Sequence, residues 1–354
     1  MKPAMRPPFT VIRLKFRDAL HIGSHRTEYD RSESVLHSDS FCSAVIQAWA
    51  ELGIEHPVLK TRGQDVPDLG FAASSLFPFF RKTPTAPPVY FFPVPQPGLQ
   101  VSDRRAFREV RWLDAATFEK ILADNTFQIN KETIHGTWLT DVADFDPKFL
   151  QKTLHARNYV PRLGELDREG KSVVDTVIYY IERIFFRENC GLFFLAHFEN
   201  DAARENLCRA LDYLKDTGIG TDRNVGHGQF EWEEMENFPF FQNLPTSDFS
   251  INLSLFCPVN VEQVQQMTHH EHCRWDLLKR GGWITSDEDF LSYRKNAVYM
   301  FREGGVFQTN ATAAGNSVNL RPDESILPLR FKNAIVRVGK SIFIPVNIQK
   351  AWQS

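Results

Sequence analysis

The residues best suited to bind an anionic ligand lie in one glycine-rich stretch, residues 217–231. Its sequence, TGIGTDRNVGHGQFE, places four glycines around a polar centre. Glycine lacks a Cβ, so its backbone can adopt positive φ angles and come close to a ligand. Successive amides can then converge on an anion, and an arginine adds a planar charged group that suits phosphate. The stretch predicts a phosphate or RNA site with these candidate residues: Gly218, Gly220, Thr221, Arg223, Asn224, Gly226, His227 and Gly228.

A purely structural role is the alternative for this stretch, with Gly218 ending a helix that leads into a hairpin. Two common nucleotide-binding motifs do not fit. The motif G-x-G-x-x-G requires glycine where the chain has Arg223, and no Lys-Ser or Lys-Thr pair completes a P-loop. Four glycines close together around an arginine nevertheless favour binding over the structural role.

The elements that must position this stretch follow from the pattern around it. We expect a buried strand at residues 191–198, a helix capped by Asp201, and a second strand at residues 229–232. The helix has one apolar face at helical spacing, formed by Leu207, Ala210, Leu211 and Leu214. The predicted order is therefore strand, helix, glycine-rich loop, strand.

A matching unit is predicted near the N-terminus. Residues 9–17 alternate as a half-buried strand with a basic, solvated outer face that contains Arg13. A polar loop follows, and then a helix with Ser38 as its N-cap and Gly53 at its end. Together the two units predict a ferredoxin-like β-α-β-β-α-β domain.

Two domains are expected in a chain of 354 residues. The first, residues 1–244, includes an irregular proline-rich segment at residues 78–97 that packs aromatic side chains on the body. The second, residues 245–354, is an α+β domain with a helix near residues 261–267. Its strands are expected at residues 297–302, 329–338 and 341–348.

Composition limits the classes of function. The formal net charge of −3 argues against a free-standing protein that binds nucleic acid through bulk positive charge, so any RNA site must be local or shared. No apolar run is long enough to span a membrane, and the N-terminus lacks the apolar core of a signal peptide. Five widely spaced cysteines without a C-x-x-C motif indicate a reducing compartment, so we expect a cytoplasmic protein that does not contact membranes.

Arginines outside the glycine-rich stretch supply two further candidate RNA contacts. The first is a run of arginines at residues 104–111, for which an ordinary solvated surface is slightly favoured. The second combines Arg157, Asn158 and Arg162 with an aromatic residue near a loop tip. Such a combination suits single-stranded RNA, and a plain surface hairpin is an equally good interpretation.

Histidines offer two alternatives that involve chemistry. A metal-independent ribonuclease needs a general base, for which His21, His37 and His227 are candidates, but no acid or oxyanion group can be assigned beside them. On a helix, His269, His272 and Cys273 have a spacing that could bind zinc, and His270 lies between them. No second pair of ligands accompanies them, so a polar helix face is favoured. We therefore expect no catalytic residue, metal or cofactor.

Several segments, in the same order along nearly the whole chain, resemble the RAMP superfamily, and within it the fourth, 5′-handle-binding (Cas-five-like) subunit of type III-A CRISPR Csm effector complexes. The most specific are the glycine-rich loop, residues 218–230, and the helix entry LHSDSF, residues 36–41. The supporting segments are LHIGS (20–24), YFFPVP (90–95), RNYVPR (157–162), GLFF (191–194), GGW (281–283) and FIPV (343–346).

The resemblance implies an α+β protein with RAMP architecture, in which two ferredoxin-like (RRM-like) domains carry long inserts. It further implies a non-catalytic scaffold that holds the 5′ handle of the CRISPR RNA in antiviral defence. Such a subunit docks the large polymerase/nuclease subunit and contacts an adjacent backbone RAMP subunit. The alternative within the superfamily is a metal-independent endonuclease that processes repeat RNA.

The resemblance also implies the RNA-facing positions. The glycine-rich loop would face the handle, and the segments LHIGS and LHSDSF add His21, Ser24, His37 and Ser38 to the expected set. Arg157, Asn158 and Arg162 would belong to an insert that lies on RNA beside the backbone subunit. Relatives often continue this insert with an Ile-Asp-Arg-like run, whereas residues 163–168 here read LGELDR, so the contacts at this point differ from the family pattern.

Overall fold

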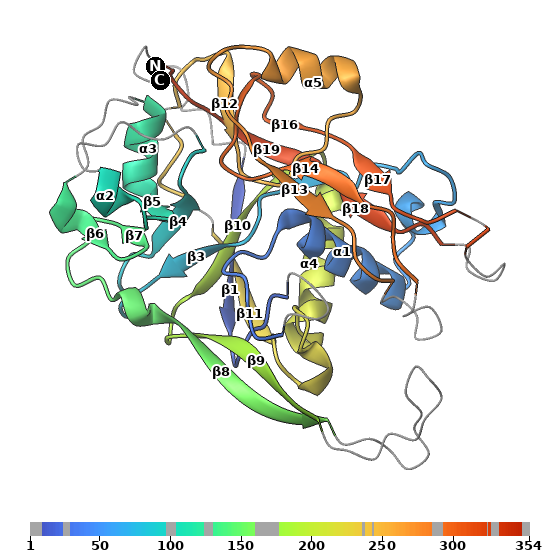
Figure 1. Ribbon diagram of the computed structural model, residues 1–354, viewed down its shortest axis with the longest axis horizontal. Coiled ribbons are helices and arrows are strands. Elements are labelled where there is room, and N and C mark those ends of the chain that lie inside the picture. Colours follow the sequence, from blue (N-terminus) through green and yellow to red (C-terminus); the bar gives the residue numbers. More distant parts are fainter. Residues whose placement is uncertain are drawn as a thin grey trace.

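The computed structural model describes residues 9–23, 29–96, 104–123, 130–159, 177–235, 238–242, 244–284, 293–323, 325–326 and 333–348. The chain is built from sheets with a few helices, as Figure 1 shows, so the expected α+β class is confirmed. Within the described residues, no helix is long and apolar enough to cross a membrane.

The main sheet has the strand order β11-β1-β10-β3-β4-β5-β7-β6. Its first part contains β11 (Phe230–Met235), β1 (Thr10–Phe16), β10 (Gly191–Phe198), β2 (Phe71–Ala73) and β3 (Phe77–Phe80). These strands pair antiparallel throughout, and β2 and β3 both pair with β10. Helix α1 (Ser38–Glu51) connects β1 to β2, and α4 (Asp201–Thr217) connects β10 to β11. The strands and helices predicted around the glycine-rich stretch and at the N-terminus are therefore present, but the N-cap of α4 is Asn200, whose side chain accepts from the Ala203 amide, and not Asp201 as predicted.

Both helices cover the same face of this sheet. The alternation of β1 turns Ile12 and Leu14 toward this face, where they join a buried cluster with Phe41, Trp49 and Phe194. Helix α4 adds its predicted apolar face, Leu207, Ala210, Leu211 and Leu214, all buried. Burial of these apolar side chains is what holds the helices against the strands.

The opposite face of β1 differs from the prediction. We expected Arg13 to be solvated, but the residue is 3% exposed and its guanidinium lies 2.9 Å from a Glu233 carboxylate oxygen. The guanidinium also lies over the ring of Phe79 at 5.6 Å. The prediction was wrong because aromatic side chains from β3 cover this part of the face, and nothing in the local alternation reveals them.

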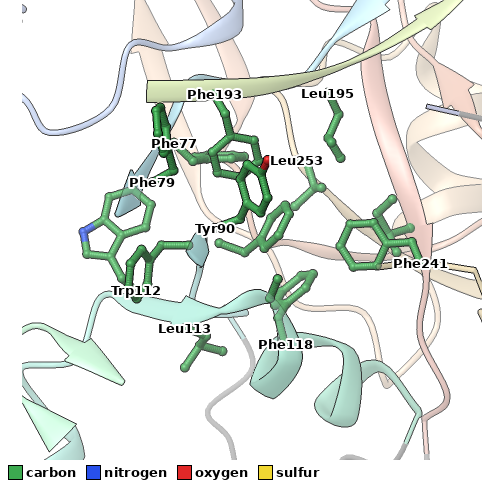
Figure 2. Packing of buried hydrophobic residues seen from close by; sticks show 14 of the residues in the cluster. Phe77, Phe79, Tyr90, Trp112, Leu113, Phe118, Phe193, Leu195, Phe241 and Leu253 are labelled. Carbon is green, nitrogen blue, oxygen red and sulfur yellow. The ribbon is translucent and has the colours of Figure 1, made fainter. Parts of the chain in front are cut away.

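The proline-rich segment is more regular than predicted. It contains β3 and β4 (Val89–Pro93), which pair antiparallel with Phe79 opposite Tyr90. Pro78 lies inside β3, opposite Leu192 of β10. Buried phenylalanines on both strands supply the apolar contact that keeps these short strands in the sheet, and Figure 2 shows several of them packed together.

The remainder of the main sheet and its surroundings are made of short elements. The strands are β5 (Trp112–Asp114), β6 (Ile134–His135) and β7 (Trp138–Leu139), and the helices are α2 (Arg104–Phe107) and α3 (Ala115–Ala123). The short 3-10 helices here and elsewhere are η1 (Pro57–Lys60), η2 (Lys131–Thr133), η3 (Pro147–Phe149) and η4 (Arg223–Val225).

A long two-stranded hairpin extends from the body, at the bottom of Figure 1. It consists of β8 (Leu150–Tyr159) and β9 (Val177–Phe186), paired antiparallel along their full length. The base of β9 is also bonded to the chain that follows β1, because Leu20 and Ile184 exchange backbone hydrogen bonds of 2.9 and 2.7 Å. The hairpin is thereby attached beside β1.

The C-terminal part forms a smaller sheet with the order β15-β12-β19-β16. The strands of this part are β12 (Phe249–Asn252), β13 (Leu277–Arg280), β14 (Val298–Phe301), β15 (Val306–Gln308), β16 (Ala313–Ala314), β17 (Ser317–Asn319), β18 (Val336–Val338) and β19 (Ser341–Pro345). The expected helix is present as α5 (Val261–Thr268), and it is the one helix among the described residues of this part. The predicted strand at residues 329–338 appears as β18, and residues 327–332 lie outside the described residues.

The two parts share one hydrophobic core. Figure 2 shows Leu253, which directly follows β12, among aromatic side chains of the main sheet, and Ile342 and Ile344 belong to the same cluster. Ser75 donates its amide hydrogen to Leu253 O at 2.8 Å, and Ser254 Oγ donates to Ala73 O at 2.8 Å. The parts are thus joined by a packed interface, and the division at residues 244 and 245 stays a prediction.

Candidate nucleic-acid interface

The glycine-rich stretch connects α4 to β11, and its four glycines all have positive φ angles, 79°, 95°, 87° and 78°. At three of them the backbone passes too close to other backbone for any side chain. A Cβ would lie 2.5 Å from His227 O at Gly218, 2.5 Å from His21 O at Gly220, and 1.9 Å from Ile219 O at Gly228. These glycines allow the loop to fold on itself and onto the chain that follows β1.

The amides of this folded part are already used. Ile219 donates to Gly228 O at 3.0 Å, Thr221 to His21 O at 3.0 Å, and Gly228 to Ala19 O at 2.9 Å. We expected successive amides to converge on an anion, but these hydrogens point into the protein. The glycines at 218, 220 and 228 therefore shape the loop, and the amides of Ile219, Thr221 and Gly228 are engaged within the protein.

The part of the loop that is open to a ligand is the turn around η4. Gly226 is exposed, and no heavy atom lies within 4 Å of a Cβ placed there. Asn224 is also exposed, and Arg223 is half-buried with one hydrogen bond of 3.0 Å from Nη2 to Gln47 Oε1. A shallow cavity of about 260 Å³ lies here between α1, α4 and the turn, and Arg223 and Asn224 line it together with Glu51 and Tyr213.

Asp222 joins this turn to the base of the β8–β9 hairpin. Its side chain is only 12% exposed and accepts hydrogen bonds of 2.7 and 3.2 Å from the Arg183 guanidinium. Arg157 Nη2 lies 3.6 Å and His227 Nε2 lies 3.9 Å from the same carboxylate oxygen. His227 Nδ1 also lies 2.9 Å from Asp18. One carboxylate thus holds two arginines and a histidine from three segments.

Sequence reasoning missed this junction. Asp222 was visible inside the glycine-rich stretch, but its main partner Arg183 is 39 residues away on β9. No local spacing connects the two. The alternation of β9 could have shown that Arg183 and Ile181 share a face, but not that this face meets the loop.

The hairpin carries the second group of expected RNA contacts. Asn158 is exposed near its outer end, and Arg157 is half-buried beside Asp222. Large apolar side chains are also exposed on the hairpin: Leu154, Tyr159, Ile178 and Tyr180. Arg162 and Ser24 lie outside the described residues, so the structure does not place them.

His21 lies beneath the loop and is 1% exposed. Its Nδ1 lies 2.6 Å from the carbonyl oxygen of Glu182, which makes Nδ1 the protonated nitrogen. Its Nε2 is buried without a hydrogen-bond partner. Thr221 Oγ1 accepts a 3.0 Å hydrogen bond from the Gly23 amide beside it. His21 and Thr221 thus connect the loop to the chain after β1.

His37 and Ser38 lie at the junction with the C-terminal part. His37 Nδ1 lies 2.8 Å from Glu303 Oε1, and Ser75 Oγ donates to the same oxygen. Burial alone would lower the pKa of His37, but the Glu303 carboxylate raises it above its ordinary value. The pairing correspondingly lowers the pKa of Glu303.

Ser38 was expected to be the N-cap of α1, and this prediction was wrong. His37 occupies the cap position and makes no capping hydrogen bond through its side chain, while Ser38 is already helical. The Ser38 hydroxyl instead accepts a 3.0 Å hydrogen bond from the amide of Leu255. The Ser38 hydroxyl therefore bonds to the C-terminal part and does not cap an amide in the first turn of α1, because the buried amide of Leu255 needs an acceptor.

The candidates for chemistry do not form one site. The general-base candidates His21, His37 and His227 are paired with Glu182, Glu303 and Asp18, respectively. In the C-terminal part, the rings of His270 and His272 lie 4.9 Å apart beside Phe249. Within the described part of the chain, no group of three or more His, Cys, Asp or Glu side chains is arranged to hold a metal ion.

Comparison with known proteins gives a consistent relationship. Residues 246–346 match the family model of the CRISPR Csm4 C-terminal domain. A curated relative from Thermococcus onnurineus, named CRISPR system Cms protein Csm4, is 29% identical over 255 residues, which cover 68% of this chain and 71% of the relative. A protein of the same name from Methanocaldococcus jannaschii is 21% identical over 375 residues, covering 95% of this chain and 97% of the relative.

Two solved structures show the same fold over nearly the whole chain. The Csm3-Csm4 subcomplex of a type III-A CRISPR-Cas interference complex contains a chain with a TM-score of 0.61 and 16% identity, covering 96% of this chain and 100% of that one. A Csm1-Csm4 cassette in complex with pppApA gives a TM-score of 0.55 and 17% identity, covering 97% and 99%. Family model, curated relatives and fold agree: residues 246–346 match the Csm4 C-terminal domain, and the chain as a whole is similar to Csm4 proteins of CRISPR systems.

Proposed function

We propose that this chain is a non-catalytic RNA-binding scaffold subunit of a type III-A CRISPR Csm complex, where it holds the 5′ handle of the CRISPR RNA. The observation that carries the proposal is the junction at Asp222, which fixes the open turn of the glycine-rich loop beside the base of the β8–β9 hairpin. An open turn that carries Arg223, next to a protruding hairpin, suits an extended single strand better than a compact ligand.

The architecture supports the finer fold assignment. In the first part of the main sheet, the strands follow the order 4-1-3-2 of a β-α-β-β-α-β unit, with both helices on one face. We assign residues 1–244 to one ferredoxin-like domain on this basis. We assign residues 245–354 to a second, which contributes β12, α5 and β19 to the shared core and its surroundings.

The RNA-binding residues proposed from the sequence fall into two groups. Arg223, Asn224 and Gly226 of the open turn, with Arg157 and Asn158 of the hairpin, are accessible and form the proposed contact surface. Gly218, Gly220, Thr221, His227, Gly228 and His21 shape the loop behind that surface, and His37 and Ser38 hold the junction with the C-terminal part.

The proposed partners come from the related complexes. A backbone RAMP subunit is supported by the Csm3-Csm4 subcomplex, and the large polymerase/nuclease subunit by the Csm1-Csm4 cassette. Exposed apolar side chains on the hairpin, such as Ile178 and Tyr180, are suited to packing against a neighbouring subunit or its RNA. The excess of negative charge also suits a subunit, because partner proteins can supply positive field. Such an assembly would work in the cytoplasm.

A scaffold role fits the histidines better than the endonuclease alternative. A general base needs a free nitrogen within reach of substrate. His21 is buried, His37 is paired with a buried carboxylate, and His227 is held between Asp18 and Asp222. His21 and His227 lie at the glycine-rich loop and His37 at the junction with the C-terminal part, and each is held by its own partners.

The test is RNA occupancy of the assembled complex. The tagged chain, wild-type or with Arg223→Glu, is purified from its host, and copurifying proteins and RNA are quantified. The variant places a negative charge against phosphate and should lower RNA per complex by about tenfold while the partner proteins are retained. Arg209→Glu, at an exposed position on α4, is the matched control and should retain RNA.

Two outcomes would contradict the proposal. One is unchanged RNA occupancy with Arg223→Glu, which would remove the open turn from the RNA site. The other is recovery of the wild-type chain alone, together with repeat RNA that it cleaves. In that case, loss of cleavage with His21→Ala, His37→Ala or His227→Ala would establish the endonuclease.

A further inference from the structure

Three basic side chains gather at the N-terminal end of α1, away from the glycine-rich loop. Arg280 lies on β13, Arg337 on β18, and Lys295 on the chain that leads into β14. The two arginines contact Asp39 in the first turn of α1, a residue with no exposed surface, and Lys295 is near enough to interact electrostatically with all three. The cluster therefore lies where the C-terminal part packs on α1.

Asp39 binds both arginines. Arg280 donates from Nε to Oδ2 at 2.8 Å and from Nη2 to Oδ1 at 3.0 Å, and Arg337 Nη1 lies 3.3 Å from Oδ2. Burial alone would raise the pKa of Asp39, but the two guanidinium groups lower it to about 2. The carboxylate is therefore ionised at any physiological pH.

One carboxylate cannot balance three cations. Arg280, Arg337 and Lys295 against Asp39 leave an excess of two positive charges when Lys295 is protonated. The neighbouring His37 is paired with Glu303 and so adds no net negative charge. Burial, followed by repulsion from Arg337, lowers the pKa of Lys295 to about 8, and burial likewise lowers the pKa of Arg337. Among the described residues, the cluster therefore holds more positive than negative charge.

The cluster also has unused hydrogen-bonding capacity. Arg337 Nε is buried without a partner, although a buried donor of this kind normally has one. Two hydroxyls stand beside the guanidinium groups: Ser40 Oγ at 2.9 Å from Arg280 Nη2, and Ser43 Oγ at 3.4 Å from Arg337 Nη1. Both serines, the two arginines and Lys295 are half-buried, so each keeps part of its surface exposed to solvent.

We propose that this cluster binds a phosphate group, held by Arg280, Arg337 and Lys295 at the N-terminal end of α1. Phosphate has several acceptor oxygens for guanidinium and ammonium donors, and its charge balances the excess. The positive end of the helix dipole favours an anion at the same place. The phosphate belongs to an RNA backbone or to a free nucleotide.

The test measures binding of three probes to the full-length chain by calorimetry at pH 7: inorganic phosphate, ATP, and a short oligoribonucleotide without terminal phosphates. Lys295→Met should weaken binding at least about tenfold, because it removes one charge-assisted contact. Lys295→Arg should restore most of it. Lys279→Met, on the exposed side of the same hairpin, is the matched control and should bind like the wild type.

The order of affinities identifies the source of the phosphate. Tighter binding of the oligoribonucleotide than of ATP assigns an RNA backbone, and the reverse assigns a free nucleotide. For the wild type, binding should weaken between pH 7 and 9 as Lys295 loses its proton. Arg223→Glu should leave the affinity for inorganic phosphate and ATP unchanged, which keeps this site distinguishable from the glycine-rich loop.

Two results would overturn the proposal. The first is that the wild type binds none of the three probes, and the second is that Lys295→Met binds them as the wild type does.

Discussion

Gly226 and Gly228 have the same backbone handedness but different surroundings. Both have positive φ, 87° and 78°, so both disfavour a side chain on backbone grounds. A Cβ at Gly228 would also lie 1.9 Å from Ile219 O, whereas a Cβ at Gly226 has no heavy atom within 4 Å. Gly228 is thus needed for the fold of the loop, and Gly226 lies on its open turn.

The two alanine variants should therefore differ in stability. Gly226→Ala should lower the free energy of unfolding by about 1 kcal/mol, which is the cost of the left-handed backbone. Gly228→Ala should lower it by about 3 kcal/mol, because the loop must also separate from Ile219. Denaturant unfolding of both purified variants measures the difference. Equal losses would mean that the close approach at Gly228 is easily relieved.

The sequence identified the residues that matter in the glycine-rich loop, but it did not show which of them shape the loop and which are open to a ligand. The glycines and Arg223 stand out in the sequence because their types suit a turn and an anion. Which glycines pack against backbone depends on how the loop folds onto its own residues Ile219 and His227, and on His21, nearly two hundred residues earlier in the chain than Gly220. Ser38 shows the same limit: its local pattern predicts a helix cap, and a distant amide takes its hydroxyl instead.

Asp222 determines how two elements sit relative to one another. Its carboxylate joins η4 to Arg183 of β9 and Arg157 of β8. Without it, two arginines would face each other with no counter-charge in a half-buried place. Asp222 therefore ties the hairpin to the glycine-rich loop, in addition to the Leu20–Ile184 backbone bonds that attach it beside β1.

Asp222→Asn should loosen the base of the hairpin. Loss of the charge leaves Arg183 unpaired at a site where its own side chain is only 11% exposed, so we expect a loss of about 3 kcal/mol in unfolding free energy. Hydrogen exchange of the β8 and β9 amides should rise. Asp144→Asn removes an exposed pair with Lys82 and should cost less than about 1 kcal/mol. Similar behaviour of the two variants would show that Asp222 does not hold the hairpin.

Secondary-structure elements were predicted well where the hydrophobic periodicity was strong. They were predicted poorly where side chains from distant parts of the chain bury the segment. Strand β1, the apolar face of α4 and the strand β10 all follow from alternation or helical spacing in the sequence. Arg13 was predicted to be solvated but is buried, and the segment that forms β3 and β4 was predicted to be irregular. In each case aromatic side chains from other parts of the chain supplied the burial that overrode the local preference for solvent or irregular structure.

The two parts of the molecule are joined by polar contacts as well as by their shared core. His37 pairs with Glu303, and Asp39 with Arg280 and Arg337, so the start of α1 binds three segments of the C-terminal part. The sequence indicated two α+β units because each has its own strands and helix. It could not show this interface, because charge pairs across 241 and 266 residues leave no local signal.

Because the junction contains titrating groups, the stability of the whole molecule should depend on pH. The folded-state pKa of His37 is raised by Glu303, so this pair stabilises the fold fully below the unfolded pKa of 6.5 and is lost as pH rises through the folded value. The folded-state pKa of Glu303 is lowered, so its contribution is present above 4.5 and is lost as pH falls. The pair therefore contributes most between about pH 4.5 and 6.5.

His37→Gln should remove part of this dependence. Wild-type unfolding free energy, measured by denaturant at pH 5.5 and 8.5, should include a loss at the higher pH that the variant lacks. His56 is the internal control, because burial lowers its pKa and its contribution changes in the opposite direction with pH. His56→Gln should therefore make the loss from pH 5.5 to 8.5 larger than in the wild type. If His37→Gln and the wild type lose the same free energy over this range, the His37–Glu303 pair does not couple protonation to the junction of the two parts.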